Sequence, residues 1–487
     1  MRSRNITKRV NSIIAMTMCF VTLTACAANP QRDIVTSKND GSFEANVIQQ
    51  ATGSVDERVL HSETFTSTDG TAEYTISIDQ EILSNALPVA KVVPHILTGA
   101  EVQKVATAVF GDVTFYDHGR SDDPQFTKEQ LQEKIQLYTQ YANEEALKEL
   151  YGPENYDASR IDHYKSLIQK YTVAMETAPA ENPNNLCDWK FRSDSNYYDP
   201  SYGDNVIFAN LEYNDIQYHI LAEIRDKKDY KISRIDIMVG DNYMEMLPID
   251  APWITLCRTE EPTDDQIADI KKRAQVILDQ MDLGDWLVSD VEIQTQYRGD
   301  IPQYEVVVSA APVIHGTQVL AGQPNQSLTS EDANAPHYFN SIAQFSFSAK
   351  GDLIYLHLIS PVDVTEVVNE GVATLSFDDL IGAAKNHLSL FGVYEGWGVS
   401  GDYIAWSQEM SGEQWVCKAQ VDDIRYGLAR VTVPDTDFCY YYVPALVFKG
   451  TAEYYGQKTG TLYESTESGT VDMVWVNAVD GSIIGEE

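Results

Sequence analysis

The sequence predicts an α+β protein in which capped helices pack on antiparallel meander sheets. Two observations carry this prediction. Several segments repeat apolar residues at helical spacing after a capping residue, and others alternate apolar and polar residues across turns that contain Gly, Asn or Asp. The chain has 487 residues, of which 43% are hydrophobic, so it is long enough to bury the cores of two or three domains.

Residues 1–25 are predicted to be a lipoprotein signal peptide. Basic residues precede a short apolar run, which is the order of a secretory signal. Leu23, Thr24 and Ala25 before Cys26 resemble the lipobox of bacterial lipoproteins, and this resemblance implies cleavage before Cys26 and thioether lipidation of its side chain. Two acyl chains give stable membrane attachment. The alternatives are a plain secretory signal and a retained anchor helix.

Lipidation predicts that the mature chain lies on the extracytoplasmic face of the cell membrane, with the membrane as a partner through the lipid anchor. Residues 26–58 are rich in small polar residues and lack sustained periodicity, so we expect a flexible tether. A flexible coil of roughly 30 residues has an r.m.s. reach of ~30 Å. After the leader, no apolar stretch is long enough to span a membrane.

Residues 59–260 are predicted to form an N-terminal α+β domain. The capping box Thr127-x-x-Gln130 opens an apolar stripe typical of a helix, and short turns separate the strand segments. In chain order, the predicted elements are two strands at 64–78, helices at 100–110, 127–150 and 158–176, and a three-stranded antiparallel meander at 205–239.

Residues 262–370 and 371–487 are predicted to form two similar helix-plus-sheet units. The capping box Thr263-x-x-Gln266 opens the helix of the first unit, and Ser376-x-x-Asp379 opens the helix of the second. Each unit continues with strands that include a hairpin with glycine at its turn. This order allows each helix to cover one face of a sheet.

The chain is strongly acidic, with a formal net charge of −38 that becomes −42 once the leader, with four basic and no acidic residues, is removed. Such a charge excludes nucleic acid and anionic lipid headgroups as partners. Cations, basic protein patches and neutral glycans remain. The alternative is that scattered acidic residues only keep the protein in solution.

Four cysteines follow Cys26, and in an oxidising compartment they allow two disulfides. Proximity in sequence favours Cys187 with Cys257 and Cys417 with Cys439, and unpaired buried thiols are the alternative. None lies in a C-x-x-C pair, so thioredoxin-like redox chemistry and a zinc knuckle both lack their usual spacing.

A structural calcium ion is the one cofactor for which the sequence offers a candidate site. Asp194, Asn196, Asp199 and Asp204 bring oxygen ligands together in one predicted loop. The loop lacks the glycine and the terminal glutamate of an EF-hand, so a solvated acidic loop is the alternative. Several tyrosines in the same loop offer stacking faces for a sugar ring or a peptide.

Catalytic motifs are absent from the sequence. It contains no H-E-x-x-H, no G-x-S-x-G and no P-loop, and its nine histidines are dispersed. His118 and His315 are candidate site residues, with a loop or core role as the alternative. With 73 acidic residues, some carboxylate pair lies at a workable distance for glycoside hydrolysis by chance. We therefore expect a protein without catalytic residues.

The last part of the chain resembles PepSY-type modules. The resemblance lies in a capped helix, the segment 441–448, and Trp475 to Ala478 before Asp480-Gly481. This part is also similar to extracytoplasmic accessory proteins of sensor kinases in Gram-positive bacteria, and the whole chain is similar to an uncharacterised lipoprotein family of gut Clostridia. The resemblance implies a non-enzymatic accessory or regulatory protein of the cell envelope with an envelope protein partner. The alternative is a glycan- or peptide-binding surface lipoprotein, and a hydrolase ranks third.

Overall fold

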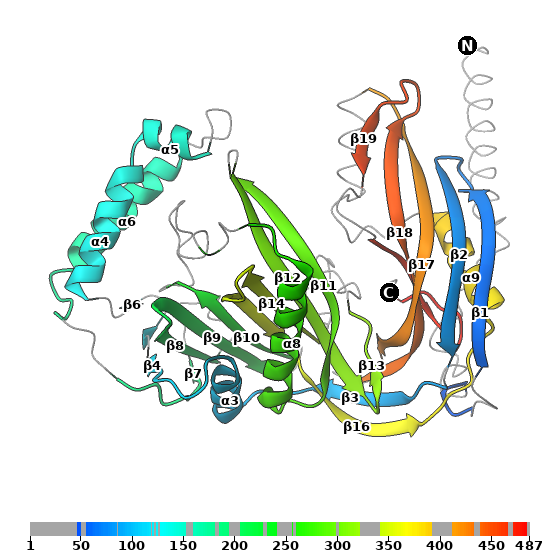
Figure 1. Cartoon of the computed structure of the whole chain (residues 1–487), viewed down its shortest axis with the longest axis horizontal. Coiled ribbons are helices and arrows are strands. Elements are labelled where there is room, and N and C mark those ends of the chain that lie inside the picture. Colours follow the sequence, from blue (N-terminus) through cyan, green and yellow to red (C-terminus); the bar gives the residue numbers. More distant parts are fainter. Residues whose placement is uncertain are drawn as a thin grey trace, which may run out of the picture. The chain divides into compact units, whose positions relative to one another are not determined.

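The computed structural model confirms an α+β fold (Figure 1). The chain divides into two compact units, unit 1 with residues 1–89, 369–426 and 443–486, and unit 2 with residues 90–368, 427–442 and 487. The structure describes residues 46–49, 55–84, 86–117, 119–120, 123–124, 127–151, 159–180, 185–193, 205–226, 231–240, 256, 260–298, 301–321, 341–391, 412–432, 439–465 and 471–484.

Unit 1 contains most of an eight-stranded sheet, together with helix α9. The strand order is β1-β2-β17-β18-β3-β16, and β19 and β20 also pair with β18. The unit boundary crosses β17 and β18, and most of β3 and most of β16 belong to unit 2. The bounds are β1 (Val55–Thr66), β2 (Ala72–Ser84), β3 (Val89–Pro94), β16 (Val362–Asn369), α9 (Phe377–Phe391), β17 (Trp415–Thr432), β18 (Tyr440–Gly456), β19 (Leu462–Ser465) and β20 (Val471–Asn477).

The predicted strand pair at 64–78 is the antiparallel β1–β2 hairpin. The Asp69 carboxylate accepts hydrogen bonds from the Ser67 hydroxyl at 2.7 Å and the Thr71 amide at 2.9 Å. Gly70 follows with φ of 72°, a conformation that favours glycine. The hydrogen bond from Ser67, followed by those from Thr71, holds the pKa of Asp69 below its usual range.

One strand pair of this sheet departs from the antiparallel meander. β2 and β17 run parallel, with Ile76 opposite Val421. No hairpin can join parallel neighbours, and here the two strands come from opposite ends of the sequence. The sheet is therefore assembled by a long-range contact and not by a local meander.

Helix α9 covers this sheet through a stripe of buried residues. Ser376 caps the helix, because its hydroxyl accepts a hydrogen bond from the Asp379 amide at 3.3 Å. Leu380, Ala384 and Leu388 are buried in one cluster with residues of β2, β18 and β20. The predicted Ser376 cap and apolar stripe are thus confirmed.

Unit 2 is built on a ten-stranded sheet with the order β11-β12-β14-β15-β10-β9-β8-β4, to which β13 adds beside β12 and β7 beside β8. Neighbouring strands of this sheet all pair antiparallel. The bounds are β4 (Tyr116–Asp117), β7 (Arg192–Ser193), β8 (Asn205–Tyr213), β9 (Ile216–Asp226), β10 (Lys231–Val239), β11 (Trp286–Arg298), β12 (Ile301–Ile314), β13 (Thr317–Gln318), β14 (Ile342–Ser348) and β15 (Leu353–Ile359).

Two helices, α3 (Gly99–Phe110) and α8 (Asp264–Met281), lie on the same face of this sheet (Figure 1). Both begin with a capping box, at Thr98 and at Thr263. Their apolar stripes pack against alternate residues of the strands in one continuous core, which includes Ile235, Ile237 and Phe345. The side chains of the intervening strand residues therefore point to the opposite face of the sheet.

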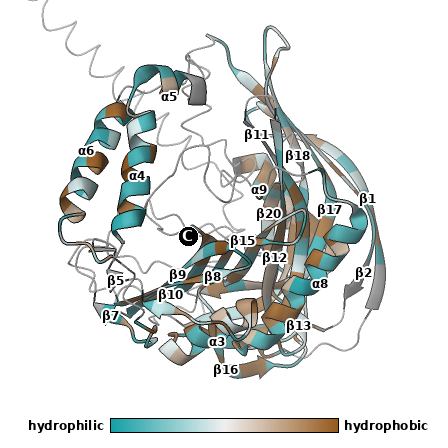
Figure 2. Ribbon diagram, turned by 60° about the vertical axis from the view of Figure 1, so that its left-hand side comes forward, coloured by the Kyte–Doolittle hydropathy of each residue, from teal (hydrophilic) through white to brown (hydrophobic). Residues whose placement is uncertain are grey.

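A separate helical part of unit 2 contains α4 (Lys128–Tyr141), α5 (Glu144–Tyr151) and α6 (Ser159–Ala174), and two short strands, β5 (Gly119–Arg120) and β6 (Asp123–Pro124), pair nearby in sequence. The helices bury a tyrosine stack, in which the centroid of the Tyr138 ring lies 5.6 Å from that of the Tyr164 ring and 5.9 Å from that of the Tyr171 ring. Figure 2 shows hydrophobic and hydrophilic residues alternating around α4 and α6. The predicted single helix at 127–150 is two helices, because Asn143 starts a new one by accepting a hydrogen bond from the Ala146 amide at 2.9 Å.

The division into units differs from the predicted domains 59–260, 262–370 and 371–487. The ten-stranded sheet crosses the predicted boundary, because β10 pairs with β15, with Ile235 opposite Leu358. The β1–β2 hairpin joins β17 and not the strands of residues 205–239. Pairing with distant strands covers edges that sequential domains would leave open. The two helix-plus-sheet patterns remain visible as α8 with β11–β15 and α9 with β17–β20.

In the part of the chain that the structure describes, no helix is both long and apolar enough to cross a membrane. The signal peptide 1–25, the lipobox residues Leu23, Thr24 and Ala25, and Cys26 lie outside the described residues, as does most of the tether 26–58. The described parts of 26–58 are not a flexible tether, because Val47 is buried with its carbonyl accepting a hydrogen bond from the Asn369 side chain, and residues 55–58 belong to β1.

Candidate functional site

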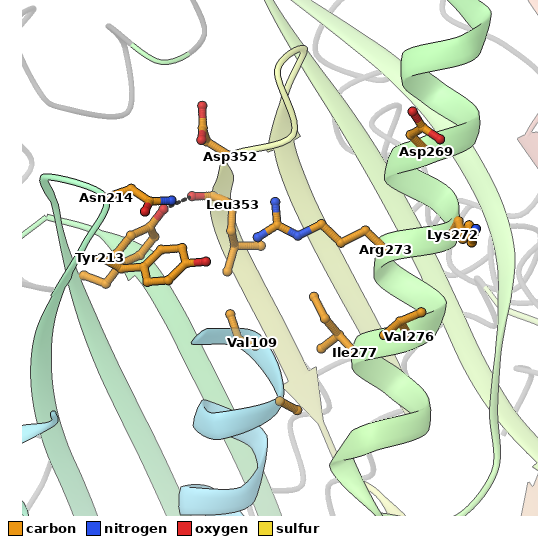
Figure 3. A pocket seen from close by; sticks show the side chains of 12 residues that line it. Val109, Tyr213, Asn214, Asp269, Lys272, Arg273, Val276, Ile277, Asp352 and Leu353 are labelled. Carbon is orange, nitrogen blue, oxygen red and sulfur yellow. Dashed lines mark hydrogen bonds between the residues drawn. The ribbon is translucent and has the colours of Figure 1, made fainter. Parts of the chain in front are cut away.

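A pocket of about 470 Å³ opens in unit 2 beside helix α8 (Figure 3). It lies between α8, the C-terminal end of α3, and two hairpin turns, one joining β8 to β9 and one joining β14 to β15. This volume falls in the range of about 300–1,000 Å³ that is usual for small-molecule sites. The lining residues are Ala108, Val109, Tyr213, Asn214, Tyr218, Asp269, Lys272, Arg273, Val276, Ile277, Asp352 and Leu353.

The two hairpin turns have defined backbone geometry. Asn214 and Asp215 have φ of 54° and 61°, as in the type I′ turns that match the twist of a hairpin. In the β14–β15 turn, Gly351 has φ of 84°, and the Ser348 hydroxyl accepts a hydrogen bond from the Asp352 amide at 3.1 Å. These turns fix where Asn214 and Asp352 enter the pocket.

The floor of the pocket is apolar and closely packed. Val109 and Ile277 are buried, and the Tyr218 hydroxyl donates a hydrogen bond to the Leu353 carbonyl at 2.9 Å. The Phe110 ring lies 4.7 Å from the Tyr218 ring, centroid to centroid. Burial raises the pKa of Tyr218 to about 12, so the hydroxyl remains a donor at neutral pH.

The rim of the pocket is charged. Figure 3 shows Arg273 extended from α8 towards Leu353 and Asn214, and its guanidinium donates a hydrogen bond to the Gly351 carbonyl. The same guanidinium lies 5.5 Å from the centroid of the Phe347 ring, a cation–π contact. Asp269 lies on the same helix and Asp352 on the opposite turn. The pocket thus combines positively and negatively charged side chains at its rim with apolar side chains at its floor.

A second polar constellation, an ionic network, lies on the face of the sheet opposite to α3 and α8. Glu223 and Asp236 are each 1% exposed. Glu223 binds two guanidinium groups, those of Arg225 at 2.5 Å and Arg234 at 2.7 Å. Their position on the opposite face follows from alternation, because the neighbour Ile235 lies in the core under the helices.

The ionic network continues onto β15. The Asp236 carboxylate lies 2.6 Å from Nδ1 of His357 and accepts a hydrogen bond from the Tyr355 hydroxyl at 2.8 Å. The Tyr355 and His357 rings stack, with centroids 5.9 Å apart. None of these side chains lines the pocket. The network links β9, β10 and β15 through side chains of Glu223, Asp236 and His357, and its role is structural.

Most of the sequence-predicted site residues lie in parts of the chain that the structure does not describe. The calcium candidates Asp194, Asn196, Asp199 and Asp204 lie outside the described residues, as do His118 and Cys257. His315 has φ of 48° and precedes Gly316 at the turn between β12 and β13, where it shapes a turn. Across the described ranges, no group of three or more His, Cys, Asp or Glu side chains is arranged to hold a metal ion.

The described cysteines are free thiols. Cys187 and Cys439 are partly buried and Cys417 is buried. Cys417 lies near the start of β17 and contacts Tyr454 near the end of β18, whereas Cys439 immediately precedes β18. Both are free thiols, so the described residues do not contain the predicted disulfide between Cys417 and Cys439. Burial raises the pKa of Cys417 and that of Cys187 to about 11, so both thiols are protonated at neutral pH.

The pocket was not predicted from the sequence, although both of its turns were. The turns at 213–215 and 350–352 carry local Asn, Asp and Gly signals. Their convergence on α8 depends on the order of strands in the sheet, for which the sequence has no local signal. The ionic network lacks such a signal as well, because its charges occupy strand positions that alternate with apolar ones.

No family model matches the chain, and no curated protein matches it. Among solved structures, the chain is similar to the crystal structure of an uncharacterized protein from Eubacterium rectale ATCC 33656, at 10% sequence identity and a TM-score of 0.33. The match covers 93% of this chain and 100% of that chain. A likeness at this level carries no argument about function.

Proposed function

We propose that this chain is a lipid-anchored accessory protein of the cell envelope that binds another envelope protein and catalyses no reaction. The observation that supports this proposal is the outer edge of β1. β1 pairs with β2 over twelve residues without a register shift and ends the strand order among the described residues. An edge of this kind offers backbone N–H and C=O groups to an added strand.

The side chains of β1 also suit a partner strand. Leu60 is 76% exposed, while its neighbour Val59 is buried in the core. Leu60 therefore offers an apolar contact beside the open edge. The net charge of −38 favours a basic, extended segment as the partner. β11, the edge strand of the other sheet, has a register shift at Val288 and Asp290, and such bulges protect an edge from pairing.

The position of β1 in the chain supports a partner at the membrane. β1 begins at Val55, shortly after the predicted lipid on Cys26. The described structure begins at residue 46, 20 positions after Cys26, and Val47 is already buried there. A flexible coil of roughly 20 residues has an r.m.s. reach of ~25 Å. Under this proposal, β1 stays within reach of the extracytoplasmic segments of membrane proteins.

A second candidate function is binding of a glycan or peptide by a surface lipoprotein. The pocket beside α8 favours it, because it combines an apolar floor with charges of both signs.

The accessory proposal is tested by photo-crosslinking in native membranes. A photoreactive amino acid replaces Leu60 in β1, and the matched control replaces Leu287 in β11, which is also an exposed leucine on an edge strand. We expect one envelope protein to be crosslinked from position 60 and none from position 287, and mass spectrometry of the N-terminal peptide to show lipid on Cys26. Equal adducts from both positions, no adduct from position 60, or an N-terminus without lipid mass would contradict the proposal.

A further inference from the structure

We infer that the pocket beside α8 binds a small zwitterion with an ammonium group, a carboxylate and an apolar side chain, which is the chemistry of an apolar amino acid or of a short peptide with free ends. The inference rests on residues of unit 2 alone, so it stands or falls independently of the role proposed for β1.

Arg273 provides the carboxylate subsite. One guanidinium nitrogen, Nη1, donates to the Gly351 carbonyl and the ring of Phe347 supports the group from one side, so the side chain is held in place before a ligand arrives. Within the described part of the chain, Nε and Nη2 of Arg273 make no hydrogen bond. A fixed guanidinium with spare donors matches the planar geometry of a carboxylate.

Asp352 and Asp269 provide the ammonium subsite on either side of Arg273. Asp352 is held by the β14–β15 turn, where the Ser348 hydroxyl lies 3.3 Å from Oδ2. Asp269 lies one helical turn before Arg273 on α8, but Arg273 is directed to Gly351. Both carboxylates are therefore available to an ammonium group at the mouth of the pocket.

The apolar floor selects the side chain of the ligand. Val109, Ile277 and Leu353 are buried, and Figure 3 shows Val109 and Ile277 below Arg273 and Leu353 beside its guanidinium. An aliphatic side chain placed there gains about 25 cal/mol for each Å² of apolar surface that it buries. Polar side chains gain nothing comparable at this floor.

The charge balance of the pocket argues for a neutral ligand overall. The lining contains two basic residues, Lys272 and Arg273, and two acidic ones, Asp269 and Asp352. A ligand with a single charge would satisfy one sign and desolvate the other without a partner. A zwitterion satisfies both.

The test is isothermal titration calorimetry on the full mature, lipidated chain in detergent, with four probes. L-leucine and leucyl-leucine carry both charges, N-acetyl-leucine lacks the ammonium, and leucinamide lacks the carboxylate. We expect each single-charge probe to bind about tenfold more weakly than leucine or leucyl-leucine, because each loses one charge-assisted contact. Tighter binding of leucine assigns a free amino acid, and tighter binding of leucyl-leucine assigns a peptide.

Two variants connect the binding to the proposed subsites. Asp352→Asn is expected to weaken leucine or leucyl-leucine about tenfold and to leave N-acetyl-leucine unchanged. Arg273→Lys is expected to weaken the same zwitterion and to leave leucinamide unchanged, since it removes the guanidinium fork but keeps the charge. Asp215→Asn is the matched control, because Asp215 adjoins the pocket in the β8–β9 turn without lining it.

The inference is overturned if neither zwitterion binds, if all four probes bind equally, or if Asp352→Asn and Asp215→Asn have the same effect. Thermal unfolding of each variant shows whether it is folded. If Arg273→Lys unfolds, Asp352→Asn still decides the result. Crosslinking from Leu60 is read out separately, so failure here leaves the accessory proposal unaffected.

Discussion

Replacing Glu223 by glutamine is expected to destabilise unit 2 by about 3–5 kcal/mol, the usual loss when one member of a buried ion pair is removed. Glu223 is 1% exposed and accepts from two arginines, at 2.5 Å and 2.7 Å. The side chains of Arg225 and Arg234 are only 14% and 18% exposed. Glutamine keeps the shape but removes the charge, so two poorly solvated guanidinium groups lose the Glu223 carboxylate, while Arg234 keeps the more distant Asp236 carboxylate at 3.6 Å.

The loss should be local to the ionic network. We would measure it by urea unfolding combined with hydrogen–deuterium exchange, following peptides from β9 and β10 and, as an internal reference, peptides from β20 in unit 1. Glu212→Gln is the matched control on β8, because Glu212 is exposed and, within the described ranges, its carboxylate accepts a hydrogen bond only from the Gln217 side chain, at 2.9 Å. We expect the control to change stability by less than about 0.5 kcal/mol.

The reasoning is refuted if Glu223→Gln and Glu212→Gln destabilise β9 and β10 equally. A loss below about 1 kcal/mol would be the value of a solvated surface pair. In that case, the network would not be the element that ties β9, β10 and β15 together.

Three further predictions concern unit 1. Gly450→Ala should destabilise unit 1 by about 1–3 kcal/mol, because a Cβ at this position would lie 1.8 Å from the Gln420 carbonyl oxygen. Gly382→Ala on α9 is the control, since a Cβ there has no atom within 4 Å, and thermal unfolding of both variants should show a loss for Gly450→Ala alone. Burial lowers the pKa of His387 to about 4, so on acidification this histidine is protonated in the unfolded chain before it is protonated in the folded one. The stability of the folded state should therefore fall as the pH drops from about 6.5 to 4. In His387→Gln, the urea midpoint should vary less with pH across this range. Hydrogen bonds from Thr459 and then Tyr463 lower the pKa of Glu413 to about 2. The contribution of Glu413 to the stability of the folded state should therefore be complete above pH of about 4.5 and lost as the pH falls towards about 2. If Glu413→Gln leaves the acid-unfolding profile unchanged, Glu413 makes no such contribution.

Local features of the fold could be predicted from the sequence, because their signals are local. Thr127 and Thr263 cap α4 and α8 through bonds to Gln130 and Gln266, three residues later in each case. The break at Asn143 escaped prediction, since the apolar stripe continues across it and only the Asn143 side chain marks a new start.

Long-range features could not be predicted in the same way. The parallel pairing of β2 with β17 and the pairing of β10 with β15 depend on which strands find each other, and alternation of apolar residues is equally compatible with several partners. The pocket inherits this limit. Arg273 looks like an ordinary exposed helix residue until β14 and β15 place the Gly351 carbonyl beside it.

The parallel contact between Ile76 and Val421 has a consequence for biosynthesis. At a synthesis rate of roughly 5–20 residues per second, the ribosome needs about 20–70 s to pass from the first of these residues to the second. During that interval the β1–β2 hairpin has emerged without β17, so the edge of β2 that β17 later covers is open. Export in an unfolded form, followed by holdase protection until the C-terminal strands arrive, would prevent such hairpins from pairing between nascent molecules.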